Sequence, residues 1–169
     1  MLNKRILAFC IMLAVLVTVL QAVPRIFEGS FVFAVILGGI LVYIAARLNC
    51  IFGVAVHLAA IVLSASMNIG EAVFFACTNG IVGLSLGIIK RRFKSIYYAR
   101  AFSALIVVVM LFAINYLLGI DIFGNTSLKP PMSQALKLFS PLYIYCLIYL
   151  KLAIFSENLL HRNINLSSY

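Results

Sequence analysis

Six apolar stretches follow one another along the chain, and this pattern restricts the fold more than any other feature of the sequence. Each is close to the roughly 17–25 residues that a helix needs to cross the hydrocarbon core of a bilayer. Hydrocarbon offers no partner for backbone N–H and C=O groups, so the spans are expected to be helices. The expected spans are residues 6–23, 31–46, 51–67, 72–89, 101–120 and 132–155. The sequence therefore predicts an all-α integral membrane protein, a bundle of six transmembrane helices in a single domain covering residues 1–169.

The composition agrees with a membrane protein and argues against a nucleic-acid-binding domain. Hydrophobic residues make up 65% of the 169 residues and charged residues only 10%, whereas soluble domains are about 45–50% apolar. The formal charge of +9 comes from cations at the ends of the spans, where they set topology and meet anionic lipid headgroups. We therefore expect the lipid bilayer as a partner and no nucleic acid.

The distribution of cations predicts the orientation of the bundle. If the N-terminus is cytoplasmic, six spans leave only Arg25, Lys129 and Lys137 of the 13 cations on the outer side, in agreement with the positive-inside rule. Both termini are then cytoplasmic, and the expected location is the cytoplasmic membrane of a prokaryote. A four-span alternative would bury Arg47 or Glu71 in the bilayer, which is costly.

The junctions between spans carry the expected breaks in the helices. Residues 47–49 and 68–71 are expected to form tight helical hairpins, and residues 24–30 and 121–131 to form outer loops. Pro141 lies inside the last apolar run and is expected to kink or restart that helix. Residues 132–140 would then form a separate, partly interfacial segment, and residues 158–169 a polar tail.

Small residues recur at helical spacing in two of the spans. Such a stripe lets a neighbouring backbone approach closely, which is how helices associate in lipid. In the fourth span the stripe consists of Ala72, Ala76, Gly80, Gly83 and Gly87, and we predict helix packing there. In the first span it consists of Cys10, Ala14, Thr18 and Ala22, which are candidates for contact with a partner helix. The pattern leaves open which stripe faces inward.

The sequence contains no recognisable catalytic or metal-binding constellation. His57 and His161 have no ligand at i+3 or i+4, and the four cysteines are far apart without a C-x-x-C pair. We expect no enzyme, no cofactor and no metal. His57 lies well inside a span, so it is either a functional residue or a neutral histidine hydrogen-bonded between helices. Asn79 and Asn115 are likewise interhelical hydrogen-bonding residues or ligand contacts.

Polar residues gather toward the outer ends of the spans. They are either ordinary solvated loop residues or the lining of an outward-opening site for a zwitterionic or polar small molecule. Aromatic residues such as Phe74, Phe75, Tyr143 and Tyr145 would then stack on a ring of the solute. The candidate substrate-binding residues are Arg25, Asn68, Glu71, Asp121, Gln134 and Tyr143.

Two segments carry a resemblance to a family. They are NGIVGLSLGIIKRRFKS, in which glycine-spaced apolar residues lead into a basic loop, and SPLYIYCLIYLKLAIFSENLLHRN, a last span that begins with proline and ends in a basic tail. With the first span, which ends at Pro24, these segments resemble the YybS-like group of small bacterial membrane proteins. That group in turn looks like the S component of energy-coupling factor (ECF) transporters.

The resemblance implies a function in uptake. An S component captures a vitamin or similar micronutrient from outside and passes it on by toppling in the membrane, while its small-residue faces slide against a transmembrane coupling subunit bound to two ATPases. Ala14 and Ala22 match that small-residue pattern, and Cys10 and Thr18 depart from it. The alternative is a membrane scaffold or assembly protein of the cell envelope or of sporulation, which transports nothing.

Overall fold

The computed structural model describes residues 4–27, 33–93, 95–117 and 131–163, with side chains for residues 8–27, 33–93, 95–116 and 135–159. Within these ranges the chain is helical and contains no strand. The helices are α1 (Lys4–Ile26), α2 (Phe33–Leu48), α3 (Cys50–Met67), α4 (Ile69–Cys77), α5 (Asn79–Arg92), α6 (Ile96–Leu117) and α7 (Pro131–Asn163). The prediction of an all-helical protein is confirmed for this part of the chain.

Five segments of the described chain are long and apolar enough to cross a membrane. They are Ala8–Ile26, Cys50–Met67, Ile69–Arg92, Ile96–Tyr116 and Ala135–Leu159. The chain is therefore a multi-pass membrane protein. The remaining expected span corresponds to α2, an apolar helix of 16 residues that is slightly shorter than a typical span. The count of six and the side of the membrane on which the termini lie stay predictions.

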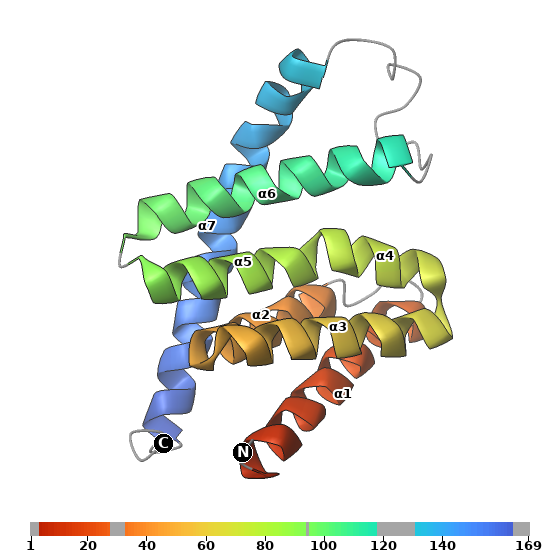
Figure 1. Ribbon diagram of the computed structural model, residues 1–169, viewed down its shortest axis with the longest axis vertical. Coiled ribbons are helices and arrows are strands. Elements are labelled where there is room, and N and C mark those ends of the chain that lie inside the picture. The colour runs from red at the N-terminus through yellow and green to blue at the C-terminus, as the bar shows by residue number, and fades with distance from the viewer. Residues whose placement is uncertain (1–3, 28–32, 94, 118–130, 164–169) are drawn as a thin grey trace.

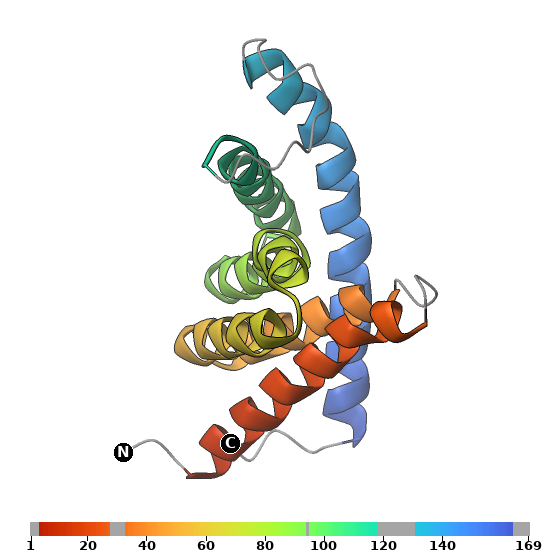
Figure 2. The same cartoon turned by 90° about the vertical axis from the view of Figure 1, so that its right-hand side faces the viewer.

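The helices form a layer that the last helix crosses. In Figure 1, α3, the α4 and α5 pair, and α6 run side by side, and Figure 2 shows the same helices nearly end-on. Next to them α2 packs mainly against α5, and α1 runs obliquely over α2 and α3. Helix α7 runs steeply across the others and contacts both α6 and α2. One helix thus connects opposite parts of the layer.

Glycines allow the close approach of α2 and α5. A Cβ atom added to Gly39 would lie 2.5 Å from the backbone oxygen of Asn79, and one added to Gly83 would lie 2.9 Å from the carbonyl carbon of Gly39. Gly87 is similarly close to Ala46, at 2.6 Å from its Cβ. In this structure the stripe of the fourth span therefore faces helices of the same chain. Ala72, Gly80, Gly83 and Gly87 are buried and Ala76 is half-buried.

The small-residue stripe of α1 also faces inward. Cys10, Ala14 and Ala22 are buried, and the first two pack in a cluster with residues of α2 and α3 that includes Val42 and Val56. The Thr18 hydroxyl donates to the carbonyl oxygen of Ala14 at 3.0 Å, inside its own helix. This stripe is covered by the chain itself, so it is not an open surface for a partner in this arrangement.

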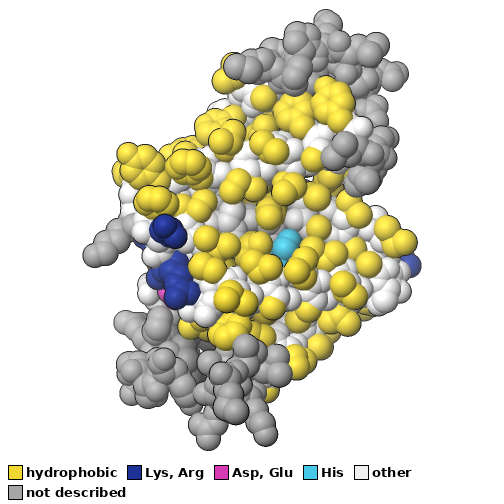
Figure 3. Space-filling view, viewed as in Figure 1, with side chains coloured by type: hydrophobic (Ala, Val, Ile, Leu, Met, Phe, Trp, Pro, Cys, Tyr) yellow, Lys and Arg dark blue, Asp and Glu magenta, His cyan; other side chains and the backbone are white. Residues whose placement is uncertain are grey.

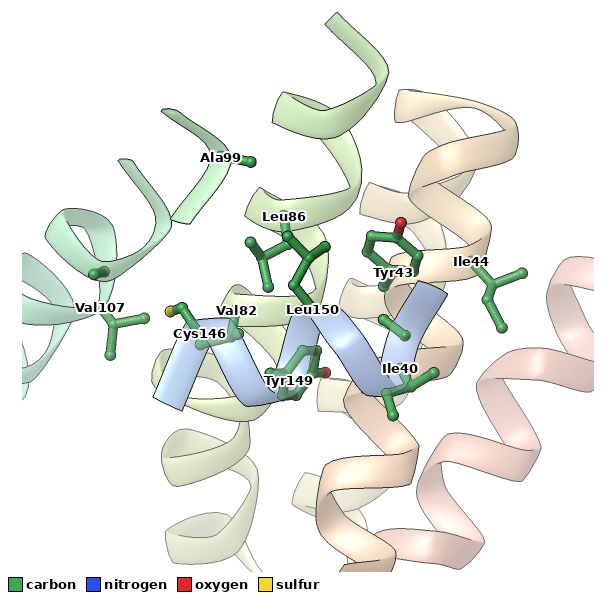
Figure 4. Close-up of a cluster of buried hydrophobic side chains, with 12 residues drawn as sticks. Ile40, Tyr43, Ile44, Val82, Leu86, Ala99, Val107, Cys146, Tyr149 and Leu150 are labelled. Carbon is green, nitrogen blue, oxygen red and sulfur yellow. The ribbon is translucent and has the colours of Figure 1, made fainter. Parts of the chain in front are cut away.

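The central core lies where α7 crosses α2, α5 and α6. Figure 4 shows Tyr149 and Leu150 of α7 among Tyr43 of α2 and Val82 and Leu86 of α5, all nearly or fully buried. Cys146, on the same helix, is fully buried beside them. Cys10, Cys50, Cys77 and Cys146 are all free thiols, which fits their interpretation as packing residues.

The structure corrects two expectations about helix continuity. Helix α7 passes through Pro141 as one helix, so residues 132–140 do not form a separate segment, and it extends to Asn163 rather than ending at residue 155. Proline costs one backbone hydrogen bond, whereas Phe139, Leu142 and Tyr143 on either side all pack against the central core. In contrast, the span expected to be continuous over residues 72–89 is divided at Thr78.

The hairpin junctions are shorter than expected. Asn49 alone separates α2 from α3, and its side chain caps α3 by accepting from the Ile51 amide at 2.9 Å. Asn68 separates α3 from α4 and caps both helices, so Glu71 lies in the first turn of α4 rather than in a loop. Asparagine favours such caps because its side-chain oxygen satisfies an unpaired helix amide.

An ion pair fixes the C-terminal part of α7 to the end of α2. Arg47 Nη2 lies 3.1 Å from Glu157 Oε1, and the Arg47 Nε also donates to this oxygen, at 3.3 Å. The hydroxyl of Tyr43, a fully buried residue, donates to Glu157 Oε2 at 3.0 Å. The carboxylate therefore joins two side chains of α2 to α7.

We expect Glu157→Gln to lower the free energy of unfolding by about 1 kcal/mol, because the amide keeps an acceptor for Tyr43 but loses the charge that attracts Arg47. The thermal unfolding midpoint of the purified protein measures this change. Lys151→Gln is the matched control on the same helix, since Lys151 is exposed. Equal midpoints for Glu157→Gln and Lys151→Gln would contradict a stabilising role for the ion pair.

Candidate functional site

The most unusual backbone feature is the division of one membrane-spanning segment at Thr78. Thr78 has φ −118° and ψ −100°, outside the helical region, and its hydroxyl donates to the Phe74 carbonyl oxygen at 2.6 Å. Two backbone hydrogen bonds pass this point, from Thr78 N to Phe74 O at 3.0 Å and from Val82 N to Thr78 O at 2.9 Å. Discontinuous helices of this kind form the substrate sites of many membrane transporters.

Two tyrosines of α7 hold the residue that follows the break. The Tyr145 hydroxyl donates to Asn79 Oδ1, and the Tyr149 hydroxyl donates to the backbone oxygen of Asn79 at 3.3 Å. Gly39 lies directly against the same backbone oxygen. Because α2 and α7 both contact the first residue of α5, the break has a defined position in the bundle.

A cavity of about 670 Å³ lies beside this break. It is lined by Gln21, Pro24 and Arg25 of α1, Val35 and Ile36 of α2, Gly70, Glu71 and Phe74 of α4, Thr78, Asn79 and Val82 at the break and in α5, Val107 and Leu111 of α6, and Leu142 and Tyr145 of α7. Small-molecule sites typically occupy about 300–1,000 Å³ and have mostly apolar walls with a few polar groups. This cavity has both properties.

One end of the cavity carries charged side chains that come from helix ends. Arg25, in the last turn of α1, donates from Nη1 to the carbonyl oxygen of Met67 at 3.2 Å and so caps α3. Glu71 lies in the first turn of α4, where its amide donates to Asn68 Oδ1 at 3.2 Å. A cation at a helix C-terminus and an anion at an N-terminus both interact favourably with the helix dipole. The two opposite charges are thus held next to the same cavity.

We expect Asn68→Ala to lower the free energy of unfolding by about 1 kcal/mol, since α4 would lose the side-chain acceptor for its Glu71 amide. Asn68→Asp keeps an oxygen in the same place and is expected to have the stability of the wild type. Thermal unfolding of the two variants, measured side by side, tests the cap. The same loss in both would show that the side-chain oxygen is not what stabilises this junction.

The predicted substrate-binding residues separate into three groups. Arg25 and Glu71 line the cavity, and Asn68 caps the helix on which Glu71 lies. Tyr143 lies elsewhere, stacked on Phe139 at 6.2 Å and beneath the guanidinium of Arg100 at 5.5 Å from its ring centre. Asp121 and the side chain of Gln134 lie outside the described residues.

The aromatic residues divide in the same way. Phe74 and Tyr145 line the cavity, whereas Phe75 is fully buried against His57. The other apolar side chains of the walls are aliphatic. Of the aromatic residues expected to stack on a ring of the solute, only Phe74 and Tyr145 therefore reach the cavity.

Sequence reasoning did not single out the glycine pair at positions 38 and 39. Gly38 lies against the side chain of Gln21, 2.7 Å from its Nε2 if a Cβ is added, while Gly39 lies against Asn79. The pair thus lets a polar residue of α1 and a polar residue of α5, both of which line the cavity, pack closely against α2. Two adjacent glycines within an apolar helix are the signal that would have identified this crossing point.

His57 lies on α3 next to the break. Its ring packs against Phe75, with ring centres 5.7 Å apart, and against Gly80, and its side chain is buried. Nδ1 has no hydrogen-bond partner within the part of the chain that the structure describes, so the expected interhelical hydrogen bond is not found at this atom. No group of three metal-ligating side chains occurs among the described residues.

The outer surface has the character of a lipid-facing one. Figure 3 shows apolar side chains over most of the face formed by α3, α4, α5 and α6, with most of the visible Lys and Arg at one end and a further dark blue spot at the opposite edge. Exposed apolar residues of α3 and α6 include Ile51, Leu58, Val62 and Phe102. The described fold is that of a multi-pass membrane protein with a partly open cavity large enough for a small molecule.

Comparison with protein-family models, with curated proteins and with solved structures finds no match.

Proposed function

We propose that this chain is a solute-binding membrane protein of the S-component kind. It captures a small micronutrient from the outer side of the cytoplasmic membrane and passes it to a transmembrane coupling subunit with its ATPases. The observation that carries the proposal is the cavity of about 670 Å³ beside a broken membrane helix, with Arg25 and Glu71 at one end. Cavities of this size and a broken helix at the binding site are both typical of proteins that bind solutes within a membrane.

The coupling subunit needs a surface other than the small-residue stripe of α1. Ala14 and Ala22 are buried within the chain, whereas the opposite face of α1 exposes large apolar residues. These include Ile11, Met12 and Val15. A coupling subunit is therefore proposed to pack on this exposed face of α1. The scaffold alternative would have to use the same exposed face, because both small-residue stripes lie inside the bundle, and it gives the cavity no role.

The test is whether a solute occupies the cavity. The protein is purified in mild detergent, and mass spectrometry identifies small molecules and subunits that copurify with it. We expect one stoichiometric small molecule with the wild type and its loss from Ile36→Trp, because a tryptophan at this lining position fills the cavity.

Val62→Trp is the matched control, since Val62 is 69% exposed on the outer face of α3. It should retain the solute. A solute retained equally by both tryptophan variants would place it outside the cavity and overturn the proposal. Recovery of envelope proteins with no solute would favour the scaffold alternative.

A further inference from the structure

Arg100, in the second turn of α6, is a cation without a counterion. Its side chain is buried, with 9% of the residue exposed, and its Nε donates to the Ile96 carbonyl oxygen of the same helix at 3.3 Å. Among the described residues no other acceptor meets Arg100, and the ion pair found there joins Arg47 to Glu157. The donors on Nη1 and Nη2 therefore have no protein partner, although a buried charge normally requires one.

Two tyrosine rings hold the guanidinium of Arg100 in place. Its Cζ lies 4.9 Å from the ring centre of Tyr97 and 5.5 Å from that of Tyr143, which itself stacks on Phe139. Cation–π contacts of this kind stabilise the charge. They supply no oxygen acceptor for the N–H groups, of which a guanidinium has five. The group is thus fixed in position and still has donors for an anion.

The surroundings of Arg100 are positively charged. Helix α5 ends in the run Lys90–Arg92, and α6 begins at Ile96, so these cations lie at the same end of the layer as Arg100 (Figure 1). Of the carboxylates that the structure describes, Glu157 is already paired, and Glu71 lies at the start of α4, near the opposite end. An anion that approaches Arg100 therefore meets little opposing charge.

The junction between α5 and α6 also lies at the depth of the lipid headgroups, because it connects two membrane-spanning segments, Ile69–Arg92 and Ile96–Tyr116. Tyr97 and Tyr98 are both more than half exposed there, and tyrosine is enriched at the membrane surface. Phe93 is half exposed next to them. The surface thus offers contacts to an anionic group and to an apolar chain at the same time.

We infer that Arg100 is the centre of a binding site for one anionic phospholipid. The phosphodiester of the headgroup accepts hydrogen bonds from Nη1 and Nη2, for which the planar guanidinium is well suited. Arg92, which is exposed, adds positive charge, and an acyl chain lies against Phe93. A zwitterionic headgroup also carries an ammonium group, which finds no unpaired carboxylate among the described residues at this end. The site therefore selects lipids by net charge, and it does not depend on the proposed solute.

Two lipids with the same acyl chains test this site. Binding of dioleoylphosphatidylglycerol and of dioleoylphosphatidylcholine to the full chain in an uncharged detergent is measured by native mass spectrometry. We expect the wild type to bind the anionic lipid about tenfold more tightly, and Arg100→Gln to lose most of this preference. Lys151→Gln removes the same charge from an exposed position of α7 and is the matched control, which should keep the preference within about twofold.

Equal binding of the two lipids to the wild type, or an unchanged preference in Arg100→Gln, would overturn the inference. Displacement of the anionic lipid by an excess of inorganic phosphate would assign the site to a soluble phosphate and overturn it as well. Arg100→Lys is measured alongside, in case Arg100→Gln does not fold. It keeps the charge but loses the planar fork, so its preference should fall by about threefold. A wild-type preference in Arg100→Lys would contradict the proposed role of the guanidinium.

Discussion

Gly39→Ala is expected to lower the free energy of unfolding by about 2–3 kcal/mol, although alanine is the better helix former. The added methyl would lie 2.5 Å from the backbone oxygen of Asn79 and would also overlap the hydroxyl of Tyr149. The neighbouring atom is backbone, so α2 and α5 would have to move apart. This movement would loosen the close packing between the two helices.

Gly70→Ala is the matched control for this prediction. A Cβ at Gly70 meets only the side-chain oxygen of Asn68, at 3.3 Å, so the variant should be as stable as the wild type or slightly more stable. Both variants are compared by the yield of monodisperse protein and by the thermal unfolding midpoint. If Gly39→Ala unfolds at the wild-type temperature, the close crossing of α2 and α5 does not exist in solution.

Asn79→Leu is expected to weaken retention of the copurifying solute at least tenfold, about 1.4 kcal/mol, because the Nδ2 donor of a cavity-lining residue is removed. The variant also leaves the Tyr145 hydroxyl without its acceptor, which should lower the free energy of unfolding by about 1 kcal/mol. Mass spectrometry of the purified variant measures the first effect and thermal unfolding the second.

Tyr145→Phe separates the two effects. It removes the same hydrogen bond but keeps the amide of Asn79, so it should lose a similar amount of stability while retaining the solute within about threefold of the wild type. Solute lost equally from both variants would mean that the hydrogen bond, rather than the Nδ2 donor, is what the solute requires.

The apolar runs predicted the helices well because the bilayer imposes both their length and their hydrogen bonding. The predicted bounds of α3 agree with the observed ones to within one residue, whereas α4 begins at Ile69 rather than at residue 72, because the single residue Asn68 caps it. Pro141 shows the limit of a local rule, because packing on both sides of it outweighs one lost hydrogen bond.

Part of the candidate site was predicted from the sequence. Arg25 and Glu71 are charges at span ends, which a sequence displays directly, and the structure brings both to one cavity together with Asn79, Phe74 and Tyr145, which the sequence also offered as possible contacts. The shape of the site depends on the break at Thr78 and on Gly38 and Gly39, which act through contacts between distant segments. The hydropathy of the sequence does not show that α7 crosses the layer steeply. The contact between Tyr145 and Asn79 therefore could not be predicted from it.

The crossing of α7 has a consequence for biosynthesis. A chain is made from its N-terminus and its segments begin to fold in that order. Leu142 and Tyr145 are the last lining residues to leave the ribosome, long after Gln21 and Arg25 have entered the membrane. Until then Asn79 has no tyrosine partner, so a nascent chain that ends at α6 would hold Arg25 and Glu71 but lack the α7 wall of the cavity. The cavity is therefore completed in the final step of synthesis rather than gradually.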